Sequence, residues 1–156
     1  MISLEIPGWG PLHLKHLVLD FNGTLAVDGV LVDGVAERLK RLAADLEVHV
    51  VTADTVGTAG EALQGLPCRV AILTPEAQDQ QKLDYISELG AELVCAVGNG
   101  RNDRLMLEDA ALGVAVMLAE GVAPETLAAA TVVCPSVLDA LDLLLHPLRL
   151  TATLRS

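Results

Sequence analysis

The chain has 156 residues and a formal net charge of −11 at pH 7. It is 52% apolar and 20% charged with only 2% aromatic residues, which excludes the disordered, collagen-like and disulfide-rich classes. A single domain of this length buries roughly 70% of its unfolded surface, so it folds without a disulfide or a metal. The negative charge argues against nucleic acid and anionic membranes as partners, whereas a local cradle with a metal ion can still bind a small phosphate ester.

Neither a targeting segment nor a membrane span is indicated. Residues 1–10 carry Glu5 and no basic region, and the longest apolar stretch, 110–119, is about half as long as a membrane helix. The three cysteines stand apart in apolar runs, as buried reduced thiols do: Cys68, Cys95 and Cys134. We therefore expect a cytoplasmic protein that has no membrane partner.

The first elements in chain order are two strands joined by a turn. Residues 2–7 and 12–19 alternate or run apolar on either side of Pro-Gly-Trp-Gly-Pro, which predicts a β-hairpin extension over residues 1–13. His13 and His16 look like a metal-binding pair. Positions three apart on a strand face opposite sides, however, so this spacing does not predict a zinc site.

A second, shorter hairpin and a helix follow. Residues 24–32 contain Asp-Gly twice and predict a hairpin with Asp28 and Gly29 at its tip. Apolar residues then recur at helical spacing as far as Ala44, and Asp33 is placed to cap that helix.

Strands and helices alternate strictly through the rest of the chain. Short apolar runs predict strands at 46–52, 68–74, 92–98, 112–117 and 131–134. Helices are predicted between and after them at 55–64, 76–89, 102–110, 123–130 and 136–146. This order is typical of an α/β fold in three layers, a parallel sheet with helices on both faces. We find no linker, so residues 1–156 are expected to form one domain.

Polar residues gather where the predicted strands end, which is where parallel sheets bind ligands. Asp20-Phe21-Asn22-Gly23-Thr24 follows the strand that ends at 19, and Thr52 ends the next. A third cluster, Gly98-Asn99-Gly100-Arg101-Asn102-Asp103, follows the strand at 92–98, and Lys82 lies in the helix before it. Each feature alone is weak, since a lone Asp after a strand is usually a cap and a lone Lys on a helix is usually solvated. Their ordered combination is the signal.

That combination resembles the haloacid dehalogenase (HAD) superfamily from about residue 14 to the end. DFNGTL resembles its first motif, Thr52 its second, Lys82 its third and GNGRND its fourth. Within the superfamily, these motifs look most like those of small proteins related to the phosphorylation domain of P-type ATPases. The resemblance implies a Rossmann-like hydrolase fold and phosphatase or ATPase-like chemistry on a phosphate ester or anhydride.

The resemblance also assigns roles to residues of this chain. Asp20 would be the nucleophile that forms an aspartyl phosphate, assisted by Thr52 and Lys82 and with Asn22 in the acid–base position. The expected phosphate-binding residues are Gly23, Thr24, Ala53 and Asn102. The expected ligands of a magnesium cofactor are Asp20, Asn22, Asn99 and Asp103.

Two positions depart from the family pattern. Most phosphatases of the superfamily have Asp where this chain has Asn22, and an amide cannot donate or accept the proton of the leaving group. The second is Asn99, which replaces a metal-binding Asp and removes a charge from the site. Loss of a general acid–base costs about 10²–10⁴ in rate, so we expect a slow hydrolase that favours good leaving groups. The alternative is a weak or inactive protein that binds phosphate or a nucleotide as a regulator.

The spacing between the motifs leaves no room for a cap domain. Between Asn22 and Thr52 there is only the hairpin at 24–32 and one helix, so the resemblance is to capless members. By analogy with these, a homo-oligomer is expected to close the open site. A two-component receiver domain also uses phospho-Asp, Thr and Lys, but residues 73–75 offer no acceptor after the third strand. The sequence does not name the substrate.

Overall fold

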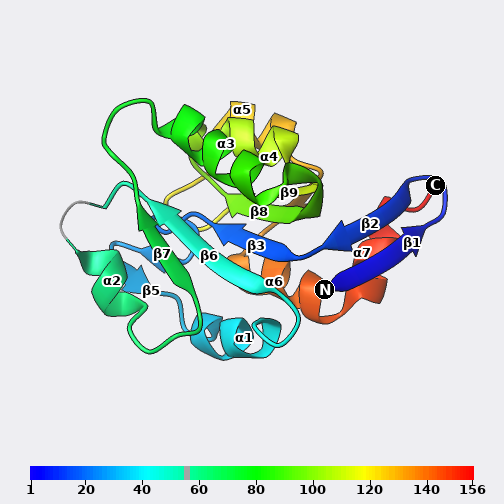
Figure 1. Ribbon diagram of the computed structural model, residues 1–156, viewed down its shortest axis with the longest axis horizontal. Coiled ribbons are helices and arrows are strands. Elements are labelled where there is room, and N and C mark those ends of the chain that lie inside the picture. The colour runs from blue at the N-terminus through cyan, green and yellow to red at the C-terminus, as the bar shows by residue number, and fades with distance from the viewer. Residues whose placement is uncertain (55–56) are drawn as a thin grey trace.

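A computed structural model describes residues 1–54 and 57–156. Six parallel strands form the central sheet in the order β10-β9-β8-β3-β6-β7 (Figure 1). From the centre outward on one side these are β3 (His16–Leu19), β6 (Glu47–Thr52) and β7 (Arg69–Ile72), and on the other β8 (Val94–Gly98), β9 (Leu112–Val116) and β10 (Val132–Cys134). The predicted α/β fold with a parallel sheet is therefore confirmed.

Helices cover both faces of the sheet (Figure 1). One face packs against α3 (Gln78–Leu89) and α4 (Arg104–Asp109), with α5 (Pro124–Ala129) beside α4. The other packs against α1 (Val35–Leu42), α2 (Thr58–Ala62) and α6 (Val137–Leu145). Two short 3₁₀ turns, η1 (Ala91–Leu93) and η2 (Arg101–Asp103), precede β8 and α4.

Strand side chains alternate between the two cores, as pleated strands require. In β3, Leu17 and Leu19 belong to the core under α1 and α6, and Val18 belongs to the core under α3 and α4. In β6, Val50 and Val51 divide in the same way. Both faces of these central strands are buried, which explains why their sequences are continuously apolar.

Two small hairpins stand outside the sheet. β1 (Ile2–Ile6) pairs with β2 (Gly10–Leu14), and β4 (Ala26–Val27) pairs with β5 (Val30–Leu31). Asp28 and Gly29 join β4 to β5, both at positive φ (51° and 76°), which is the turn that an Asp-Gly pair favours. The predicted tip is therefore confirmed.

Two local predictions need correction, and one lies partly outside the described residues. The strand expected at 12–19 divides at Lys15, because β2 pairs with β1 whereas β3 pairs with β6 and β8. Asp33 does not cap α1: the N-cap is Gly34 at φ 94°, and no side chain caps the helix. The helix expected at 55–64 is observed as α2, and residues 55–56 at its expected start lie outside the described residues.

One helix at the end of the chain was not predicted. α7 (Pro147–Leu154) begins with Pro in its first turn and packs against β1 through a face that contains buried Leu150. The Ser156 N–H then donates to the carbonyl oxygen of Pro7 (3.0 Å), which ties the end of the chain to the N-terminal hairpin. In the described part of the chain, every helix is too short or too polar to cross a lipid bilayer.

Candidate active site

Three neighbouring strands of the sheet end at the predicted site. Asp20 follows β3, Thr52 ends β6 and Gly98 ends β8. The backbone N–H of Asp20 still donates to the Val97 carbonyl oxygen (3.0 Å), so the register of β3 against β8 fixes where its carboxylate lies. β6 and β8 flank β3 on opposite sides, which makes this edge the switch point of the sheet.

Lys82 joins two of the predicted acidic residues. Its side chain reaches from α3, and Nζ donates to Asp20 Oδ1 and to Asp103 Oδ1, each at 2.7 Å. All three groups are buried, with exposed fractions of 1% for Lys82, 6% for Asp20 and 0% for Asp103. A buried ammonium needs paired acceptors, and here one ammonium serves two carboxylates. The three predicted groups therefore converge at one point.

Asp103 is held by its own loop as well as by Lys82. Its second oxygen, Oδ2, accepts from the backbone N–H groups of Asn99 (3.0 Å) and Gly100 (2.9 Å). A Cβ at Gly98 would overlap the Asp103 carboxylate, so only glycine lets this side chain fold back under the loop. With both oxygens engaged, Asp103 positions Lys82. Its expected role as a metal ligand stays a prediction.

The turn after β3 places a buried hydroxyl beside Asp20. Gly23 has φ +77°, a Cβ there would overlap the Asn99 side chain, and its N–H donates to the Ala26 carbonyl oxygen (2.7 Å). Thr24 Oγ1 lies 3.1 Å from both Asp20 Oδ2 and Asn99 Oδ1 and is fully buried. A hydroxyl has one proton, so it serves one of these acceptors at a time. Gly23 and Thr24 thus pack against Asp20 and Asn99, and their expected role in phosphate binding stays a prediction.

Asn99 is oriented by groups on its other side. Its Nδ2 donates to the Gly121 carbonyl oxygen (3.0 Å), and its own carbonyl oxygen accepts from Ala123 N–H (2.9 Å). These bonds point Oδ1 toward Thr24 and the pocket, where an amide oxygen can serve as a neutral ligand. The expected role of Asn99 as a metal ligand stays a prediction.

An open pocket of about 370 Å³ lies above these groups. It is lined by Asp20, Asn22, Thr52, Ala53, Asp54, Gln78, Lys82, Asn99, Gly100 and Asn102. Thr52 Oγ1 accepts from the backbone N–H of Asp54 (3.2 Å). The pocket is polar, and the described residues, 1–54 and 57–156, contain no cap domain over it.

Gln78 is a pocket residue that the sequence analysis missed. Its Oε1 accepts from Asn102 Nδ2 (2.7 Å), which links α3 to the loop after β8. Gln78 lies one helical turn before Lys82, so the two share a face of α3. That i, i+4 spacing was the signal that could have found it. By contrast, the nearby Arg101 side chain is 86% exposed, and its Nε lies 3.8 Å from Glu125 Oε1.

Burial dominates the electrostatics of the site. Desolvation, followed by the charge of Asp103, raises the pKa of Asp20 to about 6, although Lys82 and the Thr24 hydroxyl oppose the rise. The two carboxylates raise the pKa of Lys82 above its ordinary value despite burial, so the ammonium stays charged. The cluster carries one positive and up to two negative charges, and it therefore holds a net negative charge when Asp20 is ionised.

The donor set suits a hard divalent cation. The groups that line the pocket offer oxygen atoms: the Asp20 carboxylate and the amide oxygen of Asn99, with Asn22 at the rim. Oxygen ligands and a residual negative charge are what Mg²⁺ prefers, and Mg²⁺ keeps waters where the protein supplies few ligands. The residues present therefore fit magnesium, with fewer charged ligands than four carboxylates would give.

Sequence comparison connects the chain to two archaeal proteins. It is 42% identical over 78 residues to the uncharacterized protein MJ0073 of Methanocaldococcus jannaschii, a match that spans 47% of this chain and 84% of that protein. It is 46% identical over 39 residues to MJ0072 of the same organism, spanning 25% of this chain and 89% of that protein. No protein-family model matches the chain. The chain belongs to one family with MJ0073.

Solved structures define the fold class. A chain named as a subfamily III A hydrolase of the HAD superfamily, from Legionella pneumophila, superposes with a TM-score of 0.71 at 20% identity, covering 90% of this chain and 88% of that chain. This protein has the HAD fold. The cobalt-bound phosphatase YrbI of Haemophilus influenzae gives a TM-score of 0.71 at 15% identity, with 92% and 94% coverage. The 3-deoxy-D-manno-octulosonate 8-phosphate phosphatase of Moraxella catarrhalis gives 0.66 at 15%, with 86% and 87% coverage.

The raised pKa of Asp20 leads to a specific prediction about Asp20→Asn. Because the native state holds the Asp20 proton more tightly than the unfolded chain does, ionisation of Asp20 destabilises the metal-free protein. Asp20→Asn removes that cost and is expected to raise the free energy of unfolding by about 1–3 kcal/mol at pH 7. The gain should be absent below about pH 4 and complete above about pH 6, since stability falls as Asp20 ionises between the two pKa values.

Thermal unfolding with a chelator present measures this difference across pH. Asp109→Asn, at an exposed carboxylate of α4, is the matched control and should leave the unfolding temperature unchanged. A destabilised Asp20→Asn protein at pH 7 would contradict the assigned electrostatics.

Proposed function

We propose that the protein is a magnesium-dependent phosphohydrolase that works through an aspartyl phosphate on Asp20. The observation that carries the proposal is the position of Lys82 Nζ, 2.7 Å from both Asp20 and Asp103 at the floor of an open polar pocket. A carboxylate at a strand end, held by a buried cation and reachable from solvent, is arranged for attack on an electrophile such as phosphorus. The fold is shared with phosphatases, which supports this choice of electrophile.

In the first step an oxygen of Asp20 attacks phosphorus in line with the leaving group. The bond from phosphorus to the leaving oxygen breaks as the carboxylate–phosphorus bond forms. In the second step water attacks phosphorus and frees Asp20 with release of inorganic phosphate, and the proton of that water passes to solvent. Lys82 stays charged throughout and stabilises the negative charge on the phosphoryl oxygens.

Neutral donors complete the proposed phosphate cradle. Thr52 accepts a hydrogen bond from Asp54 N–H, so its own hydroxyl proton can be donated to a phosphoryl oxygen. Ala53 and Asn102 line the same pocket, and Gln78 fixes the amide of Asn102. Because these groups are held before substrate binds, little reorganisation is needed during the reaction.

A bound magnesium ion would neutralise charge on the phosphate and orient it against Asp20. Asp20, Asn22 and Asn99 would hold the ion, and Asp103 would act indirectly through Lys82 and the loop that carries Asn99. With one carboxylate ligand among them, magnesium affinity should be lower than in a site with several acidic ligands. The solved HAD-fold neighbours with magnesium or cobalt bound support the choice of a divalent ion.

We expect turnover to be limited by the lack of a general acid–base at position 22, where this chain has Asn22. Asn22 is exposed at the pocket rim, where a carboxyl could protonate the leaving group and later deprotonate water. An amide does neither, so we expect slow turnover and a preference for leaving groups that depart unprotonated, such as those of acyl phosphates and nucleotide anhydrides. The open pocket suits a small phosphorylated substrate, and the Moraxella neighbour is a phosphatase of a small phosphorylated sugar acid. Closure of the pocket by a second copy of the chain stays a prediction.

A second candidate function is phosphate or nucleotide binding without turnover. It is favoured by one specific observation: both departures, Asn22 and Asn99, replace an acid by the amide of the same shape. Such a protein would still bind phosphate in the pocket but would not catalyse its transfer to Asp20 or to water.

Covalent labelling separates the two functions. Incubation with magnesium and a ³²P-labelled acyl phosphate should give one labelled, alkali-sensitive phosphate per chain on Asp20, seen by gel autoradiography and intact-mass spectrometry. Asp20→Asn should abolish the label, and the exposed control Asp109→Asn should retain it. Binding of inorganic phosphate with no label from an acyl phosphate or ATP would favour the non-enzymatic function, and a label that survives in Asp20→Asn would contradict the assignment of the nucleophile.

Restoring the missing acid should accelerate the reaction. Asn22→Asp is expected to raise the turnover number at least tenfold, because it supplies the proton donor at the pocket rim. Steady-state release of phosphate, measured with saturating magnesium, checks this. Asn102→Asp adds a carboxyl to the same pocket away from Asn22 and should give no acceleration. Equal rates for Asn22→Asp and the unaltered protein would mean that proton transfer is not what limits turnover.

A further inference from the structure

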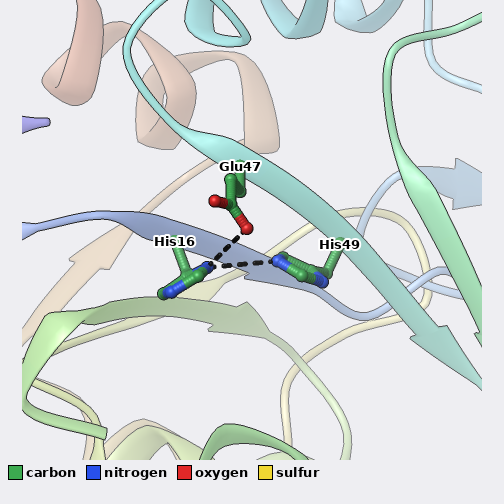
Figure 2. Close-up of side chains that lie close together, drawn as sticks. All are labelled: His16, Glu47 and His49. Atoms are coloured by element: carbon green, nitrogen blue, oxygen red, sulfur yellow. Dashed lines mark hydrogen bonds and ion pairs between the residues drawn. The ribbon is translucent and has the colours of Figure 1, made fainter. Parts of the chain in front are cut away.

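Two buried histidines and a carboxylate meet at the other end of the strands that carry the candidate active site. Figure 2 shows His16 on β3 facing Glu47 and His49 on β6. His16 Nδ1 lies 3.3 Å from His49 Nε2 and 3.5 Å from Glu47 Oε2, and the three ligand atoms all lie within 4.8 Å of one another. Both imidazoles are buried, with exposed fractions of 5% and 1%.

We propose that His16, His49 and Glu47 bind a divalent transition-metal ion of the zinc class, in a site separate from the magnesium site. Two imidazole nitrogens and one carboxylate oxygen are a ligand set that zinc favours and that magnesium does not. A solvent molecule would complete the tetrahedron. Nothing in the proposed phosphatase chemistry uses these residues.

The two distances from His16 Nδ1 fit the edges of a tetrahedral metal site. In a tetrahedral zinc site with bonds near 2.0–2.1 Å, neighbouring ligand atoms are about 3.3 to 3.4 Å apart. The observed 3.3 and 3.5 Å correspond to such edges, and they lie at the long end of the range for a hydrogen bond and an ion pair. His16 Nδ1 carries at most one proton, so at most one of these two contacts can be a full-strength hydrogen bond donated by His16, and the donor in the His16–His49 contact depends on the tautomers.

A neighbouring residue prepares His49 for this role. Tyr85, on α3, has its hydroxyl oxygen 2.8 Å from His49 Nδ1. If Nδ1–H donates to that oxygen, Nε2 carries the lone pair and points at His16, which is how partners of metal-bound histidines set the tautomer. Burial lowers the pKa of both His16 and His49, so both rings are neutral and available as ligands at neutral pH.

Glu47, the third proposed ligand, connects the site to solvent and limits its affinity for a metal ion. The Glu47 side chain is 47% exposed and can rotate to close the remaining edge. It also lines an open surface pocket with Cys68 and Arg69. The charges of Lys15 and Arg69 oppose a cation here, whereas Glu47 favours one. We therefore expect weaker binding than in a closed four-ligand zinc site.

The position of the cluster suggests what the ion does. His16 lies four residues before Asp20 on β3, His49 three residues before Thr52 on β6, and Tyr85 one turn after Lys82 on α3. The strand rise places the cluster roughly 10–13 Å below the active-site edge. An ion at this point would connect β3 to β6 and, through Tyr85, to α3, which are the three elements that bring Asp20, Thr52 and Lys82 together.

Metal titration of the full chain tests the proposal. Metal-free protein is titrated with Zn²⁺ in competition with a chromophoric zinc indicator, with excess Mg²⁺ present to occupy oxygen-ligand sites. We expect one Zn²⁺ per chain, affinity at least tenfold lower in Glu47→Gln, and binding lost in His49→Gln. His13→Gln alters a neighbouring exposed histidine that bonds Ser3 instead, and it should bind as the unaltered protein does.

Two further measurements keep the test decisive. Glu47 is half exposed, so Glu47→Gln is expected to fold even if a buried histidine variant does not, and Zn²⁺ should raise the unfolding temperature of the unaltered protein and of His13→Gln but not of Glu47→Gln. Asp20→Asn should retain the Zn²⁺, which separates this site from the proposed active site. Failure to bind Zn²⁺, equal binding in Glu47→Gln and the unaltered protein, or loss of binding in Asp20→Asn would each overturn the proposal.

Discussion

The candidate site depends on one buried ammonium shared by two buried carboxylates. Lys82 Nζ holds Asp20 and Asp103 at 2.7 Å each, and without it two negative charges would face each other in the interior. Coulomb repulsion between them would then drive one carboxylate to take up a proton. In the proposed reaction the same ammonium would also meet the negative charge of a phosphoryl group.

Two glycines leave room for the side chains that surround this interaction. Gly98 leaves the space that Asp103 occupies, and Gly23 leaves the space beside Asn99. Asp103 in turn binds the N–H groups of Asn99 and Gly100, so the loop after β8 and the ammonium on α3 share one anchor. Asn99 belongs to the same network, because its backbone N–H donates to Asp103 and its side-chain Nδ2 donates to the Gly121 carbonyl oxygen. An amide at this position can therefore hold the loop after β8 in place.

The sequence could predict the fold and the meeting of Asp20, Thr52, Lys82 and Asp103, because parallel strands end at one edge and each of these residues follows or faces a strand end. It could not predict which oxygens of Asp103 are engaged, since that depends on how the loop folds back against Gly98. His16 and His49 are 33 residues apart, and only the register of β3 against β6 brings them together. α7 was not predicted, although Leu150 and Leu154 stand one helical turn apart; in the structure it packs against α6 and β1.

The most direct test of the shared ammonium is the pKa of Asp20, followed by ¹³C carboxyl NMR in metal-free protein with and without Lys82→Met. Burial and Asp103 raise this pKa to about 6 while Lys82 opposes the rise. Replacement of Lys82 should therefore move the pKa upward, because the charge that favours the carboxylate is gone. A pKa that stays the same or falls in Lys82→Met, or an ordinary carboxyl pKa in the unaltered protein, would contradict this account.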